Sequence, residues 1–576
     1  MRDDAEFTDG EPVTAEDVAY TFTTAAKEGG LTDVTSLRSA KAVDDDTVEL
    51  TLVKPQSTFV NRLVSLGIVP EHAHGKDYAQ KPVGSGPFTL VDWAKGEQLV
   101  VARNDDYYGE KSPFERIVFV FTDEDASLAA ARTGEVHLAG LPASLATQEI
   151  PGMRLEAITS IDNRGLHFVT VPKEGRKSPA GLPIGNDVTA DRAIRQAVNY
   201  AVDRQALVDG VLEGFGSPAS GPVDNSPWFN PDSAIEDADV DRAEQLLADA
   251  GWADTDGDGV VEKGGLDAAF TLLYPAGDSL RQGLALSVVD QVKPAGIKIT
   301  TEGVSWDEIY QRLHTDSVLF GWGSHDPYEM YSLYKSDLAG TDLLNAGYYS
   351  SKPVDRHLDA ALAATDPDRA NEEWKAAQLD AQGNGFTASA DAAWAWLVNL
   401  EHTYFVDDCL DLGEPHIEPH GHGWPITASI SQWSGAADGP ASGRAQRPAA
   451  HPSLVRGGVL PFLVRSRLRR VVDARGRRRV RTRRRRVGLR LAHRACPLLV
   501  GCEVVVLLGL VVVRHRSTFP LGRPAVAGLA ACVASYPLRG RAMPATVDRP
   551  GTMGAWTRDG PGSSRNGNVC CTALPG

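Results

Sequence analysis

Several residue types are missing from long parts of this 576-residue chain. Residues 1–435 contain one cysteine, Cys409, which excludes a framework of disulfides within that range. Residues 436–576 contain no lysine, although they carry 26 arginines and only five acidic residues. Met1 is followed by RDDAEFTDG, which lacks the apolar run of a signal peptide. The sequence therefore predicts either a cytoplasmic protein or a chain whose true start is missing.

The charge of the chain is as unevenly distributed as its cysteine. The whole chain has a formal net charge of −18, but residues 1–435 hold 71 acidic and 32 basic residues. Such a negative part argues against nucleic acid as a partner and favours solubility. We interpret residues 1–435 as an acidic globular protein that is long enough for several domains.

The arginine-rich part, residues 436–576, has three interpretations. Residues 466–490 resemble a basic arm for nucleic acid. Residues 498–513 form a 16-residue apolar run that contains Glu503, which is short of the roughly 20 residues needed to span a membrane. Arginine, alanine, glycine, proline and valine have GC-rich codons, so the third interpretation is translation out of frame. We favour the third and predict that residues 436–576 form no packed domain.

Motifs of catalysis are missing as well. The chain has no HExxH, no GxSxG and no cysteine–histidine pair of known spacing. GSGPF at residues 84–88 lacks the lysine of a phosphate-binding loop, so we interpret it as a turn that enters a strand.

Histidines are concentrated in two short segments. Imidazoles two residues apart on an extended segment point the same way and can chelate a metal. Their spacing here matches no closed zinc site, so we interpret them as loop histidines and keep the second group as weak metal candidates. The two groups are His72 with His74, and His416 with His420 and His422.

Residues 254–265, DTDGDGVVEKGG, resemble a calcium loop because Asp254, Asp256 and Asp258 alternate before a glycine. An EF-hand needs an acid at its twelfth position, where this chain has Gly265. It also needs a second helix, whereas the following LDAAFTLLYP is typical of a strand. We therefore predict a glycine-rich turn between a helix and a strand.

Helical and strand patterns alternate along the first 435 residues. Thr14 and Asp17 are typical of a helix start, and Ser305 with Glu308 forms a second capping box. Gly134 ends a further predicted helix, and residues 116–122 and 268–275 are typical of strands. The alternation predicts an α/β fold with mixed sheets. More than 400 residues exceed one core, so two lobes with a ligand cleft between them are expected.

Six stretches, in this order, resemble family 5 extracytoplasmic solute-binding proteins of ABC transporters, the oligopeptide, dipeptide and nickel binders. They are residues 7–22, 82–93, 99–108, 194–208, 246–265 and 320–334. The resemblance covers residues 7–433 and implies a two-lobed periplasmic-binding-protein type II fold with a hinge. It implies lobe one at 1–175, lobe two at 176–395 and a return to lobe one at 396–435. It also implies that the first strands of lobe one and a signal sequence are missing here.

FGWGSHDPYEMYSLY, residues 320–334, is the most informative loop. In peptide binders of the family, an aspartate of this loop pairs with the ligand's α-amino group and the tryptophan lines the cleft. Here a histidine stands where the acid is expected, and the acid lies directly before a proline. The alternative is a structural turn whose acid accepts backbone N–H groups. The candidate ligand-binding residues of this loop are Trp322, His325, Asp326, Tyr328 and Tyr331.

Residues 395–408 are typical of a strand that carries polar groups. The resemblance implies that the chain returns to lobe one here, which makes Asn399 and His402 candidate ligand-binding residues near the hinge. The alternative is an interior strand with satisfied polar groups.

The resemblance implies a binding protein rather than an enzyme, with no cofactor. It would act as an extracytoplasmic monomer, associated with the membrane or cell surface, that captures peptide-like solutes and delivers them to an ABC permease. Three alternatives remain open. They are a nickel or metal–metallophore binder of the same fold, a metal-dependent enzyme using residues 416–422, and a truncated gene product without function.

Overall fold

The structure is a computed structural model that describes residues 1–28, 32–341, 343–420, 424–435 and 503–509. Most of the arginine-rich part and His422 lie outside the described residues. Among the residues that are described, no helix is both long and apolar enough to cross a membrane.

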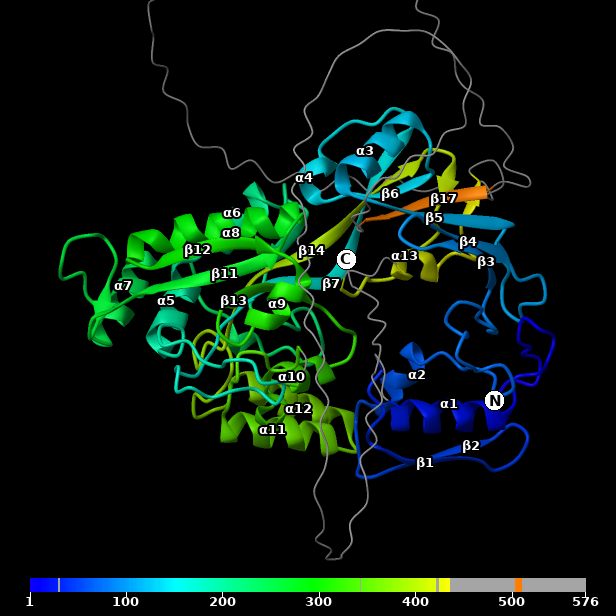
Figure 1. Ribbon diagram of the computed structural model, residues 1–576, viewed down its shortest axis with the longest axis horizontal. Helices are drawn as coiled ribbons and strands as arrows, with labels where there is room; N and C mark the ends of the chain where they lie inside the picture. Colours follow the sequence, from blue (N-terminus) through cyan, green and yellow to red (C-terminus); the bar gives the residue numbers. More distant parts are fainter. Residues whose placement is uncertain (29–31, 342, 421–423, 436–502, 510–576) are drawn as a thin grey trace, which may run out of the picture. The chain divides into compact units, whose positions relative to one another are not determined.

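The first helix lies along a two-stranded hairpin, as Figure 1 shows. The three elements are α1 (Ala15–Glu28), β1 (Leu37–Ala42) and β2 (Val48–Leu52). The predicted capping box is confirmed, because the Asp17 N–H donates to Thr14 Oγ1 and the Thr14 N–H donates to Asp17 Oδ2 at 3.3 and 3.0 Å. Phe22, Val34 and Phe59 are buried in a small core between these elements.

The main element is a mixed sheet with the strand order β12-β11-β13-β7-β14-β6-β17-β5-β4-β3, and β8 pairs with β14 outside this path. Its strands are β3 (Phe88–Ala94), β4 (Gln98–Arg103), β5 (Arg116–Thr122), β6 (Leu138–Gly140), β7 (Met153–His167), β8 (Gly216–Pro218), β11 (Ala269–Pro275), β12 (Lys298–Val304), β13 (Ser317–Trp322), β14 (Trp394–Asp407) and β17 (Glu503–Gly509). Two short pairs accompany it: β9 (Glu262–Lys263) with β10 (Leu266–Asp267), and β15 (Leu410–Asp411) with β16 (Ser434–Gly435).

Two long antiparallel strands, β7 and β14, connect two groups of strands. The end of β7 pairs with β13, through Asn163 to His167, on the side of β11 and β12. The end of β14 pairs with β6, through Tyr404 to Val406, on the side of β5, β4 and β3. The two-lobed α/β fold with mixed sheets that the sequence predicted is confirmed, and β7 and β14 are the strands that connect its two groups.

The other helices lie in the segments between the strands. They are α2 (Arg62–Ser65), α3 (Glu124–Thr133), α4 (Ala143–Ala146), α5 (Arg192–Ala201), α6 (Arg204–Gly210), α7 (Val240–Asp249), α8 (Ser279–Val292), α9 (Trp306–Arg312), α10 (Tyr328–Tyr334), α11 (Lys352–Ala363), α12 (Pro367–Gln378) and α13 (Trp424–Ala428). Single turns of 3₁₀-helix occur at Phe59–Asn61, Pro231–Ser233, Lys293–Ala295 and Ser336–Leu338.

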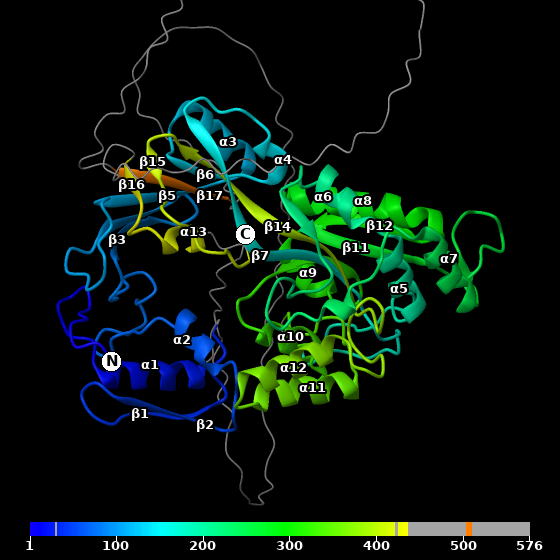
Figure 2. The same cartoon turned by 180° about the vertical axis from the view of Figure 1, so that it is seen from behind.

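Two large apolar cores lie on either side of β11 and β13. One contains Ile194 of α5, Leu247 of α7 and Leu284 of α8. The other surrounds Trp374 and includes Tyr334, where α10, α11 and α12 gather (Figure 2). The predicted helix ends are confirmed at Gly134, which takes φ 71° after α3, and at Ser305, whose hydroxyl accepts the Glu308 N–H.

Residues 503–509 form β17, which runs parallel to β5 along its whole length and to β6 at Val506 and Leu507. The apolar run at 498–513, considered above as a membrane segment, therefore contains a strand between two strands of the sheet. Its valines and leucines suit a strand with neighbours on both sides. The remainder of the predicted unpacked part lies outside the described residues.

Candidate functional site

The predicted ligand loop begins where β13 ends at Trp322 and continues to the start of α10 at Tyr328. Asp326 is buried, and its carboxylate pairs with Nη1 of Arg62 at 2.9 Å. It also accepts the N–H of Tyr328 at 2.9 Å. Burial raises the pKa of Asp326, against the opposing effects of the Tyr328 N–H and the Arg62 charge. The acid expected to take a ligand amine thus has a cation of its own chain beside it.

The aromatic residues of the loop have partners in other segments. The rings of Tyr328 and Tyr331 stack with centroids 5.3 Å apart. Their hydroxyls donate to Asp33 and Asp359 at 3.0 and 3.1 Å. His325 is exposed, and its Nε2 lies 3.1 Å from the carbonyl oxygen of Ile417.

A buried polar network lies where β7 and β14 run side by side. Asp162 of β7 contacts His402 Nε2 with one oxygen at 2.9 Å and His420 Nδ1 with the other at 2.7 Å. Burial alone would raise the pKa of Asp162, but the Arg164 guanidinium and the two histidines hold it well below its usual range. The predicted residues His402 and His420 are therefore brought together through Asp162, a residue that the sequence did not single out.

Glu418 extends this network on the other side of His402. Its Oε2 lies 2.5 Å from His402 Nδ1 and accepts the Tyr404 hydroxyl at 2.8 Å. Burial alone would lower the pKa of His402, but the hydrogen bonds to Asp162 and Glu418 outweigh burial and raise it to about 9. His402 is thus an imidazolium between two carboxylates at neutral pH.

Asn399 stands apart from this network. Its side-chain amide donates to Pro218 O at 3.2 Å and to Asp224 Oδ2 at 3.1 Å. These bonds match the alternative of an interior strand with satisfied polar groups.

Two buried arginines meet at Gly321 of β13. Arg164 of β7 pairs with Asp162, and Arg281 of α8 pairs with Asp278. A Cβ atom at Gly321 would lie 2.5 Å from Arg164 Nη1 and 2.8 Å from Arg281 Nη2. Burial and the neighbouring Arg164 charge lower the pKa of Arg281. The missing side chain at 321 therefore gives two guanidinium groups room to converge.

Glu329, in the first turn of α10, lies against the same strand end. Its Oε2 accepts the Gly323 N–H at 3.0 Å. Burial, with the charges of Asp162 and Asp326, raises the pKa of Glu329 to about 8. The carboxyl is therefore mostly protonated at neutral pH.

Around the end of β13, several buried polar atoms have no hydrogen-bond partner among the described residues. Buried polar atoms are rarely left in this condition, because each loses the free energy of a hydrogen bond to water. Three donors and two carboxyl oxygens among them matter for the site. They are Arg164 Nε, Arg281 Nε, Trp322 Nε1, Glu329 Oε1 and Glu418 Oε1.

The other histidines are dispersed. His72 pairs with Asp9 at 2.8 Å and His74 contacts the Tyr20 hydroxyl at 3.0 Å. His416 is exposed. None of these contacts joins two imidazoles, so the described residues of the two histidine segments do not combine into a metal site.

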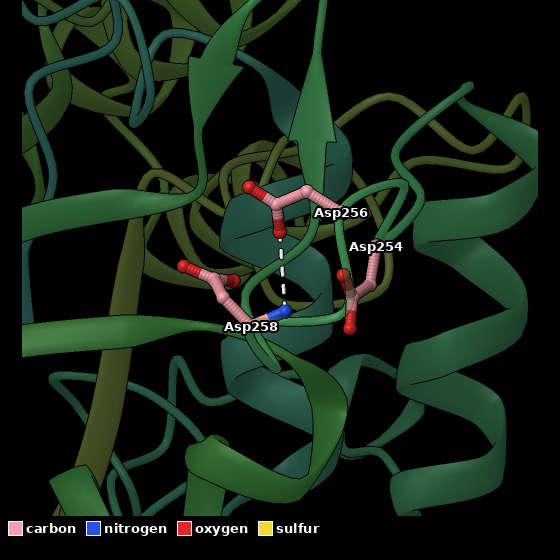
Figure 3. A group of neighbouring side chains, drawn as sticks. All are labelled: Asp254, Asp256 and Asp258. Atoms are coloured by element: carbon pink, nitrogen blue, oxygen red, sulfur yellow. Dashed lines mark hydrogen bonds between the residues drawn. The ribbon is translucent and has the colours of Figure 1, made fainter.

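Asp254, Asp256 and Asp258 do lie close enough together to hold a cation, and all three are exposed (Figure 3). Their carboxylates accept backbone N–H groups of the same loop, from Gly257, Asp258, Gly259 and Val260, at 2.7 to 3.1 Å. A short strand pair follows the loop instead of a second helix. The stretch is the glycine-rich turn that the sequence predicted.

Sequence reasoning missed most of the charged residues of the site. Asp162 and Arg164 belong to a polar run, IDNRG, that shows no apolar alternation, so the strand β7 was not predicted there. Arg281 looks like one more charge on a helix, and Glu418 lies in a histidine-rich loop. The signal that could have indicated these residues is the run of three consecutive polar residues, 162–164, close to the predicted hinge.

Residues 1–342 match the bacterial extracellular solute-binding proteins, family 5, middle region. The chain belongs to this family. Protein XP55 of Streptomyces lividans is 36% identical over 428 residues, which cover 71% of this chain and 74% of that protein. The oligopeptide-binding protein AppA of Bacillus subtilis is 27% identical over 399 residues, covering 64% of this chain and 70% of AppA.

A solved structure of a family 5 fold agrees with the architecture. NikZ from Campylobacter jejuni, in complex with Ni(L-His), has a TM-score of 0.65 and 24% identity, and the match covers 75% of this chain and 87% of NikZ. The two-lobed fold of the periplasmic binding proteins is therefore that of this chain. Family 5 consists of proteins that bind solutes such as peptides or nickel complexes for ABC importers.

Proposed function

We propose that this protein captures a peptide-like solute between its two lobes, outside the cytoplasmic membrane, and delivers it as a monomer to an ABC permease. The lobes in this proposal are residues 1–175 with 396–435, and residues 176–395. Binding and closure need no covalent chemistry, and the proposal is therefore a binding protein rather than an enzyme.

The group of unpartnered buried atoms at the end of β13 carries this proposal. Arg164 Nε and Arg281 Nε are donors suited to a carboxylate or a carbonyl oxygen, and Glu418 Oε1 is an acceptor suited to an N–H group. A peptide carries both kinds of group along its main chain and at its ends. AppA of Bacillus subtilis is an oligopeptide-binding protein, which supports the same solute class.

A metal–chelate complex is the second candidate. The observation that favours it is the pair of guanidinium groups at Gly321, which would attract the carboxylates of a chelating carrier. NikZ binds such a complex, Ni(L-His). A bare nickel ion fits less well, because both nitrogens of His402 and Nδ1 of His420 already contact carboxylates.

Isothermal titration calorimetry with di- to pentapeptides, nickel alone and nickel with excess L-histidine tests the proposal. We expect binding of one or more peptides with the full chain. Binding confined to the nickel–histidine complex would replace the peptide by the chelate. Arg281→Met is expected to weaken binding of whichever probe is recognised, since it removes one of the two converging guanidinium groups.

A further inference from the structure

Arg62 joins two parts of the chain that are far apart in sequence. It begins the short helix α2, and its Nη1 pairs with Asp326 before α10, where the two side chains are 12% and 10% exposed. Its guanidinium carbon lies 4.5 Å from the centre of the Tyr328 ring. A buried ion pair that also covers an aromatic ring is held by more than charge alone.

The residues before Arg62 also contact the second of these two parts of the chain. The Ser57 N–H donates to Leu362 O at 2.7 Å, and the Ser57 hydroxyl donates to Ala361 O at 2.9 Å. These carbonyls belong to the last turn of α11, where helix carbonyls lack partners within the helix. Segment 57–62 therefore caps the C-terminal end of α11 and also forms an ion pair at the start of α10.

The Arg62 guanidinium is only partly used by these contacts. Its Nε and Nη2 are buried and have no hydrogen-bond partner among the described residues. Arginine keeps its charge under all ordinary conditions, so these N–H groups remain strong donors. Two buried donors without a partner cost free energy, which a further acceptor would relieve.

We propose that Arg62 couples solute capture to closure. Its Nη1 pairs with Asp326, and its Nε and Nη2 donate to a carbonyl or carboxylate oxygen of the bound solute. This inference rests on the proposed function and deepens it, because it names a solute contact supplied by segment 57–62. A solute with an acceptor oxygen at this point completes the hydrogen bonds of Arg62. The closed arrangement then gains stability from the solute itself.

Three variants separate the Arg62–Asp326 ion pair from the solute contact. Arg62→Lys keeps a cation for Asp326 but removes the Nε and Nη2 donors. Asp326→Asn removes the negative charge of the ion pair and leaves all donors of Arg62 in place. Arg62→Ala removes both, and Arg38→Ala, an exposed arginine on β1, is the matched control.

Calorimetry with trialanine and tetra-alanine on the full chain gives the first readout. Loss of charge-assisted hydrogen bonds predicts that Arg62→Lys and Arg62→Ala weaken peptide binding about tenfold to a hundredfold. Asp326→Asn is expected to weaken it clearly less, and Arg38→Ala to leave it unchanged. Equal losses for Arg62→Lys and Asp326→Asn, or no loss for Arg62→Lys, would overturn the solute contact.

Hydrogen exchange of the free protein, followed by mass spectrometry, gives the second readout. Arg62→Ala is expected to speed exchange in segments 57–61 and 326–331, while Arg62→Lys keeps the wild-type protection. If protection is unchanged in Arg62→Ala, the ion pair does not hold these two segments together, and this result does not depend on peptide binding. If the wild-type protein binds neither peptide nor nickel–histidine, the proposed function is refuted. If the wild-type protein binds and the Arg62 variants bind equally well, only this inference is refuted.

Discussion

The protonated carboxyl of Glu329 gives the sharpest test of the site's electrostatics. Its pKa of about 8 in the folded protein lies above the ordinary value of 4.5. The folded protein therefore binds an additional proton between these two values. The stability that the neutral carboxyl contributes is present below pH 4.5 and is lost as the pH rises through 8.

Glu329→Gln removes the titration but keeps the shape of the side chain and an oxygen for the Gly323 N–H. The pKa difference corresponds to about 5 kcal/mol of unfolding free energy in total, and about 4 kcal/mol of it falls between pH 5 and pH 9. We therefore expect the variant to gain stability relative to wild type by this amount over that range. His402 and the other titrating groups are present in both proteins and cancel in the difference.

Urea unfolding followed by tryptophan fluorescence at pH 5, 7 and 9 measures the two free energies of unfolding. Glu244→Gln, an exposed position on α7, controls for the chemistry of the substitution. A difference between Glu329→Gln and wild type that stays constant from pH 5 to pH 9 would show that Glu329 is ionised in the folded protein. The account of the site as a place of buried, uncompensated polar atoms would then be refuted.

Three further predictions concern the same region and the acidic loop. Gly321→Ala places a Cβ 2.5–2.8 Å from Arg164 Nη1, His420 Cε1 and Arg281 Nη2; overpacking of this kind should lower the unfolding free energy by about 1–3 kcal/mol, and urea melts that give the wild-type value would contradict the crowding. His402→Asn should lower the unfolding free energy by up to about 3 kcal/mol below pH 6.5, a deficit that shrinks as the pH rises through 9; urea melts at pH 6 and pH 10 check it, and an equal deficit at both is the contrary result. Calcium at millimolar concentration should leave the melting temperature unchanged, because the loop carboxylates already accept backbone N–H groups; a rise that Asp256→Ala abolishes would contradict this.

Much of the fold could be predicted because the helix ends are encoded locally. Thr14 with Asp17, Ser305 and Gly134 each form the cap that their residue types favour, and each depends on neighbours within a few positions. The long strand β7 could not be predicted in this way. Its polar residues are buried by pairing with β13 and β14, strands that lie more than 150 residues away.

The contacts of the predicted loop depend on residues that the sequence did not single out. The loop after β13 is where the resemblance placed it, yet the cations that define its charge come from other segments. Arg62 lies 264 residues before Asp326, and Arg164 meets Arg281 only because β7 pairs with β13. A single sequence gives no measure of such pairings, so every one of these arginines was indistinguishable from a solvated surface charge.

The internal ion pairs explain how the fold can hold this site without a solute. Arg62, Arg164 and Arg281 each pair with an acid of the same chain, which offsets the cost of burying a charge. Because the charges are matched inside the protein, a solute does not have to supply a compensating charge in order to enter. It has to supply hydrogen-bond partners for the atoms that the ion pairs leave over. Affinity at such a site depends on the position of acceptor and donor groups, which a peptide main chain repeats along its length, and less on the solute's net charge.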